Sequence, residues 1–228
     1  MFPIRDSIAP RRSPVLVPLL IAVNVLVYLY MLPMPASVEE AWVTLHGLVP
    51  ARFFAGLGDP AAFVPAFTSM FLHGGLLHLA GNMWFLWIFG DNVEDRLGRL
   101  GFVVFYLLSG LAAAAGQLFA EPTSTIPMVG ASGAIAGVLG AYMRLYPRAR
   151  VEAAVPILLF IQMIELPAVM FLGLWFVMQF LGLGSPGVAW WAHILGFVAG
   201  FLLSFLAPRR AEPDRRAPAR YVRYRRRA

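Results

Sequence analysis

The sequence predicts an all-α membrane protein with six transmembrane helices, and three observations lead to this fold class. Of the 228 residues, 60% are hydrophobic and only 13% are charged, which is too apolar for an ordinary soluble domain. Several apolar stretches approach the roughly 20 residues that a helix needs to cross a bilayer. The arginines gather in alternate loops, and the chain has no lysine. The absence of cysteine excludes disulfides, zinc–thiolate sites and cysteine nucleophiles.

The six apolar segments follow one another with clear breaks between them. They cover approximately residues 15–32, 76–92, 100–119, 132–146, 166–183 and 192–206. The first loop, residues 36–72, is too polar to span and too long to be structureless, so we expect short amphipathic helices lying in the membrane interface. Residues 151–164 are apolar but short, and Pro156 interrupts them. We expect a re-entrant or surface segment there.

The arginines predict the orientation and the division of the chain. Seventeen of the 18 lie before the first helix, in the 2–3 and 4–5 loops, or in the tail, and only Arg52 lies elsewhere. By the positive-inside rule both termini are cytoplasmic. We expect a cytoplasmic segment (1–14), a membrane domain (15–207) and a basic cytoplasmic tail (208–228). The tail accounts for the high pI without predicting nucleic-acid binding. The all-arginine, Ala- and Pro-rich composition suggests a GC-rich bacterial genome, and a multi-pass protein would then lie in the bacterial inner membrane.

Three polar residues are expected at one depth near the outer surface, and a fourth shares a helix face with one of them. His78, Ser132 and His193 stand near the starts of the second, fourth and sixth helices, which all begin on that side. Asn82 follows His78 by four residues and therefore shares its helix face. Ser132 opens its helix, where free backbone N–H groups can stabilise an oxyanion. One buried histidine is usually structural, but three such residues at one level point to chemistry.

Small residues adjoin these side chains and predict close helix packing. Gly133 and Gly137 are four apart on the fourth helix, as are Gly196 and Gly200 on the sixth. Such pairs let helix backbones approach, which would bring Ser132 to His193. The expected packing residues of the site are Gly130, Gly133, Gly137, Gly196 and Gly200. No acidic residue expected on the outer side follows a triad pattern, so a serine–histidine dyad is favoured. The chain has no H-E-x-x-H motif, which disfavours a zinc protease.

Three stretches of the chain resemble the rhomboid intramembrane serine proteases. They are His73-Gly-Gly-Leu-Leu-His-Leu-Ala-Gly-Asn82, Gly130-Ala-Ser-Gly133 and Ala192-His-Ile-Leu-Gly196. The resemblance implies a six-helix rhomboid-like bundle with Ser132 as nucleophile and His193 as general base. It also implies an oxyanion site formed by His78, Asn82 and the Ser132 backbone N–H.

The resemblance further implies how substrates are handled. The partners would be single-span membrane proteins in the lipid bilayer, cut near the outer face without cofactor or metal. The 5–6 loop (184–187) would be a mobile cap and the fifth helix a lateral gate. Two features depart from the family: Ala136 replaces an aromatic residue that often stacks on the histidine, and a Trp-Arg pair of the first loop is missing.

Two other functions fit parts of the pattern. A non-catalytic rhomboid-like protein could bind transmembrane helices with the same groove. A small transporter would need polar residues near the bilayer centre, where Asn24 is the main candidate. The first is the stronger alternative.

Overall fold

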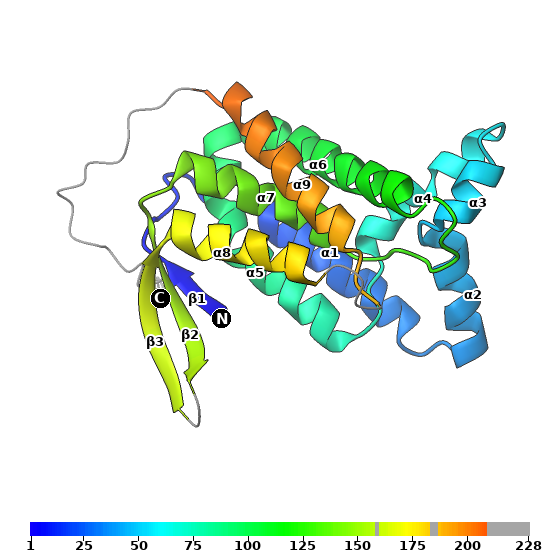
Figure 1. Cartoon of the computed structure of the whole chain (residues 1–228), viewed down its shortest axis with the longest axis horizontal. Coiled ribbons are helices and arrows are strands. Elements are labelled where there is room, and N and C mark those ends of the chain that lie inside the picture. Colours follow the sequence, from blue (N-terminus) through cyan, green and yellow to red (C-terminus); the bar gives the residue numbers. More distant parts are fainter. Residues whose placement is uncertain (158–159, 183–186, 209–228) are drawn as a thin grey trace, which may run out of the picture.

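The structure, a computed structural model, describes residues 1–157, 160–182 and 187–208 as a helical bundle with a small sheet at one end (Figure 1). The long helices are α1 (Leu16–Met31), α5 (Leu76–Leu97), α6 (Arg99–Ala120), α7 (Ser132–Leu145), α8 (Ala168–Leu181) and α9 (Trp190–Leu203). Each of the six predicted apolar segments overlaps one of them. The helix α5 runs past the charged residues at its end and stops at Gly98, whose φ of 75° lets α6 begin at the next residue.

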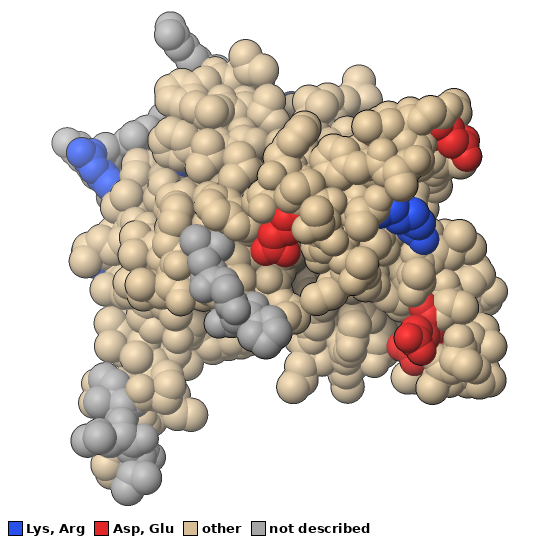
Figure 2. All heavy atoms as spheres, turned by 45° about the vertical axis from the view of Figure 1, so that its right-hand side comes forward, with Lys and Arg blue, Asp and Glu red and all other residues tan. Residues whose placement is uncertain are grey.

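The number of transmembrane spans remains a prediction. Among the described residues, α6 is the one helix that is long and apolar enough to cross a membrane by itself. The helix α5 meets the same criteria only together with residues 60–71, from which it is bent by 81°. The apolar helices α1, α8 and Trp190–Leu206 are shorter. The face shown in Figure 2 is mostly uncharged and carries only scattered acidic and basic side chains.

The first loop contains the expected short helices. They are α2 (Ala36–His46), α3 (Pro50–Ala55), η1 (Pro60–Phe63), α4 (Pro65–Thr68) and η2 (Ser69–Phe71). In Figure 1 they lie at the end of the bundle opposite the sheet. A backbone bridge between Leu48 and Met128 joins this loop to the segment before α7. The loop therefore helps to fix the approach to Ser132.

A three-stranded antiparallel sheet corrects the all-α prediction. Its strands are β1 (Phe2–Asp6), β2 (Arg150–Ile157) and β3 (Phe160–Pro167), paired in the order β1-β2-β3. The stretch 151–164, which we expected to be re-entrant or on the surface, forms most of the hairpin, and the N-terminal segment supplies the third strand. The physical reason is that Pro156 disfavours a helix and that the run is rich in β-branched residues, which favour strands.

The bundle is centred on α7, and α9 packs directly against it. Ten consecutive residues of α7, from Gly133 to Tyr142, are buried. A methyl group on Gly196 would overlap the Gly133 carbonyl, and one on Gly200 would overlap the Gly137 backbone. The two helices therefore touch backbone to backbone, which only glycine permits. We call this contact the α7–α9 seam.

Two carboxylates tie the N-terminal segment to the sheet end of the bundle. Glu94 accepts hydrogen bonds of 2.8–3.0 Å from the first backbone N–H groups of α1, at Val15, Leu16 and Val17. It thereby satisfies donors that would otherwise lack partners and complements the helix dipole. Asp6 accepts hydrogen bonds from Asn92 of α5, at 2.9 Å, and from the Tyr142 hydroxyl of α7.

Candidate active site

A tight glycine turn places Ser132 at the start of α7. The φ of Gly130 is 123°, a conformation that side-chain-bearing residues rarely adopt. A Cβ at this position would also lie 2.8 Å from the ring of His78. The Gly130 N–H donates to the Ser69 carbonyl at 2.9 Å, which anchors the turn to the first loop. Position 130 therefore requires glycine, both for its backbone conformation and because the His78 ring leaves no space for a side chain.

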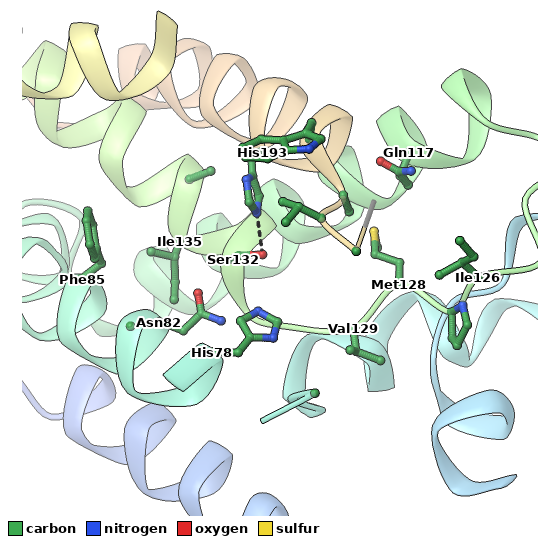
Figure 3. Close-up of a pocket in the computed structure, with 18 of the residues that line it drawn as sticks. His78, Asn82, Phe85, Gln117, Ile126, Met128, Val129, Ser132, Ile135 and His193 are labelled. Carbon is green, nitrogen blue, oxygen red and sulfur yellow. Dashed lines mark hydrogen bonds between the residues drawn. The ribbon is translucent and has the colours of Figure 1, made fainter. Parts of the chain in front are cut away.

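Ser132 and His193 form a hydrogen-bonded pair across the α7–α9 seam. The distance between Ser132 Oγ and His193 Nε2 is 2.8 Å (Figure 3), within the range for proton transfer. Ser132 lies at the first position of α7 and His193 in the first turn of α9, so the close backbone contact brings their side chains together. Indole rings lie near the imidazole at centroid distances of 6.1 Å for Trp175 and 6.0 Å for Trp190.

The structure adds Gln179 to this pair, a residue that the sequence analysis missed. Its Oε1 lies 3.0 Å from His193 Nδ1, and its Nε2 donates to the Trp175 carbonyl at 2.7 Å. Gln179 is one polar residue in an otherwise apolar 14-residue helix. That isolation was a usable signal, because an uncharged amide inside an apolar helix needs a polar partner.

His78 and Asn82 lie on the same face of α5 and point toward Ser132 (Figure 3). Asn82 is buried, with 8% of its surface exposed, and its Nδ2 has no hydrogen-bond partner among the described residues. The His78 ring packs edge-on against the His73 ring at 5.1 Å. A buried donor without an acceptor is costly unless a ligand supplies one. The position of Asn82 is thus suited to receive an oxyanion.

These side chains line one cavity of about 810 Å³ (Figure 3). It is bounded by α5, α6, α7, α8 and α9 and by the segments that precede α7 and α9. His46 and His73, the other two histidines of the chain, are not among its lining residues. Of the predicted packing glycines, Gly133, Gly137, Gly196 and Gly200 form the seam behind it, and Gly130 forms the turn. Most of the predicted cap (184–187) lies outside the described residues.

The described residues contain no group of three or more His, Cys, Asp or Glu side chains arranged to hold a metal ion. The polar side chains around the Ser132–His193 pair are instead His78 and Asn82, which line the same cavity, and Gln179, which contacts His193 from behind. In combination with the pair they can accept a proton, attack a carbonyl carbon and donate to a developing negative charge. This set defines a serine–histidine site inside a helical bundle.

The chain belongs to the rhomboid family. Residues 60–210 match the rhomboid domain, which covers more than half of the sequence. Members of this family are integral membrane proteins and are generally intramembrane serine proteases.

Relatives from bacteria and from eukaryotes support this membership. The chain is similar to YdcA of Bacillus subtilis, named as a candidate rhomboid protease, with 32% identity over 152 residues, 64% of this chain and 67% of that protein. It is also similar to the mitochondrial rhomboid protein 1 of Saccharomyces cerevisiae, with 36% identity over 36% of this chain and 25% of that protein. RHOMBOID-like protein 4 of Arabidopsis thaliana is 36% identical over 59% of this chain and 32% of its own length.

Proposed function

We propose that this chain is an intramembrane serine endopeptidase in which Ser132 is the nucleophile and His193 the general base. The observation that carries the proposal is the 2.8 Å hydrogen bond between them at the N-terminus of α7. A serine is a weak nucleophile without an adjacent base, and an oxyanion needs fixed donors nearby. Both requirements have candidates in the same cavity.

The reaction follows from the geometry. Ser132 Oγ attacks the carbonyl carbon of the scissile peptide bond while its proton passes to His193 Nε2. The tetrahedral oxyanion receives hydrogen bonds from His78, Asn82 and the Ser132 backbone N–H. The intermediate collapses as His193 donates its proton to the departing amine, leaving an acyl-enzyme. Water then attacks the ester with His193 again as base, and the serine hydroxyl is restored.

The substrate class and the cellular setting belong to the same proposal. Substrates would be single-span membrane proteins that reach the cavity laterally and are cut near the outer face. The membrane domain (15–207) would have six spans with both termini cytoplasmic, in a bacterial inner membrane. This arrangement is supported by the arginine distribution. Peptide hydrolysis needs water, which favours a site close to the surface.

The test compares two serine-to-alanine variants of the purified full chain. Ser132→Ala should abolish labelling by a fluorophosphonate probe and cleavage of a model single-span substrate. Ser109→Ala is the matched control, because Ser109 is fully buried on α6 and is not among the residues that line the cavity. It should keep both activities.

Two results would contradict the proposal. Either Ser132→Ala labels and cleaves as well as the wild type, or the wild type does neither. In the second case, co-purification of single-span proteins with the wild type and with Ser132→Ala would favour a non-catalytic protein that binds transmembrane helices.

A further inference from the structure

Gln179 is buried where its helix otherwise faces outward. Four of the 14 residues of α8 are buried, and Gln179 is the one among them that lies beyond Leu172. Its exposed fraction is 5%, whereas its neighbours Met178 and Phe180 are 49% and 46% exposed. An amide buried in apolar surroundings is unfavourable unless both of its ends are hydrogen-bonded. In the structure both ends are.

The two hydrogen bonds of Gln179 determine which way its amide points. The Trp175 carbonyl can only accept, so the amide nitrogen must face it, and Nε2 lies 2.7 Å away. The amide oxygen then faces His193 Nδ1 at 3.0 Å and can only accept from it. Nδ1 must therefore carry the proton of the neutral imidazole. This leaves the lone pair of Nε2 directed at Ser132 Oγ, 2.8 Å away, as a general base requires.

We propose that Gln179 is a positioning residue that fixes the tautomer and the ring orientation of His193. The catalytic part of this inference rests on the proposed function, but the tautomer itself does not. The Gln179 amide orients the histidine as the aspartate does in a Ser-His-Asp triad, but it brings no charge into the bundle. An isolated buried carboxylate would be strongly disfavoured there, whereas an amide supplies the same acceptor in neutral form.

Gln179 also accounts for the departure at Ala136. The aromatic side chain that would stack on the histidine from α7 is missing there, and Ala136 is fully buried. The imidazole is instead held from the side of α8 and from its own helix. Trp175 lies at an interplanar angle of 37° to the ring and Trp190 at 81°, while Gln179 binds Nδ1. The orientation of His193 is therefore set by a hydrogen bond and two indoles in place of one stacked ring.

The first experiment measures kcat and KM separately for variants of Gln179 in proteoliposomes. Gln179→Met keeps the length of the side chain and removes the amide acceptor, and it should lower kcat about tenfold or more with little change in KM. Gln179→Glu should keep kcat within a few-fold of wild type. A neutral carboxyl group can donate to the Trp175 carbonyl and accept from the Nδ1–H of His193, as the amide does. Met178→Leu, on the exposed face of the same turn, is the matched control.

The second experiment observes the tautomer directly and needs no activity. The chain has four histidines, so protein labelled with ¹⁵N-histidine gives few imidazole signals, and His193→Ala assigns those of His193. In the wild type Nδ1 should carry the proton and Nε2 should not. In Gln179→Met the signals should shift toward a mixture of tautomers, and in Gln179→Glu they should return toward wild type.

The outcomes separate this inference from the proposed function. The inference is wrong if wild-type His193 is protonated on Nε2, or if Gln179→Met leaves both the ¹⁵N signals and kcat unchanged. A wild type without any peptidase activity, but with the expected tautomer and its loss in Gln179→Met, would contradict the proposed function while supporting the role of Gln179 toward His193.

Discussion

The two helices that supply partners to His193 are packed in opposite ways. The helix α7, which carries Ser132, has ten of its 14 residues buried and touches α9 through glycine backbones. The helix α8, which carries Gln179, has four of 14 buried. Backbone contact between helices cannot adjust by side-chain rotation, whereas a glutamine side chain can lose its bond if its helix shifts.

This difference separates two properties of the site. The distance between nucleophile and base depends on the α7–α9 seam and is as fixed as the bundle itself. The orientation of the base depends on α8, half of whose residues are exposed. If α8 moves outward to admit a substrate, as the resemblance to rhomboids implies, the Ser132–His193 pair stays together while Gln179 leaves His193. Complete assembly of the site then requires α8 to return.

The largest effect is expected from breaking the seam with Gly196→Ala. The added methyl would overlap the Gly133 carbonyl, a backbone atom that cannot turn away. Overpacking of this kind costs roughly 1–3 kcal/mol, and relief by separation of the helices would also lengthen the Ser132–His193 distance. We expect a lower midpoint of thermal unfolding in detergent and at least a tenfold loss of cleavage, roughly the change in rate expected for a misplaced reacting group. Unchanged stability and activity would show that the seam does not set the site.

A smaller and pH-dependent effect is expected where α7 is tied to the sheet. Asp6 accepts hydrogen bonds from Tyr142 of α7 and Asn92 of α5. Burial, with a contribution from the nearby Asp91 carboxyl, raises the pKa of Asp6 from 3.8 to about 8. Between pH 3.8 and about pH 8 the Asp6 carboxyl is therefore protonated in the folded protein and ionised in the unfolded chain. This contribution to stability is greatest below pH 4 and is lost as the pH rises to 8, with a slope of at most about 1.4 kcal/mol per pH unit.

Asp6→Asn tests this linkage. Asparagine keeps an acceptor for Tyr142 and cannot ionise, so the variant should lack this part of the decline in unfolding temperature between pH 5 and pH 8. The measurement is a series of thermal unfolding curves for both proteins in one detergent. Parallel curves for wild type and Asp6→Asn would mean that the Asp6 carboxyl does not titrate in this range.

The α7–α9 seam and α8 differ in how much of their structure could be predicted from the sequence. The sequence could connect Ser132 with His193 through the seam glycines. Alternate helices of a membrane bundle are expected to begin on the same side, and glycine pairs four residues apart indicate close helix packing. The hairpin before α8 was missed, since a short apolar run with a proline does not by itself distinguish a strand from a re-entrant segment. Gln179 was missed because its partner lies on another helix at a distance that sequence spacing does not provide.

The smallest effect is expected from Gly173→Ala, the counterpart of Gly196→Ala on the loosely packed helix. A Cβ at Gly173 would meet no atom within 4 Å, so the methyl has space. Alanine also favours the helix over glycine by about 1 kcal/mol, so the variant should unfold at the same temperature as the wild type or slightly higher. Its cleavage rate should stay within about twofold of wild type, since Gly173 is not among the residues that line the cavity. A loss as large as that of Gly196→Ala would mean that this face of α8 is covered by a tightly packed partner in the membrane, and the contrast between the two helices would then be wrong.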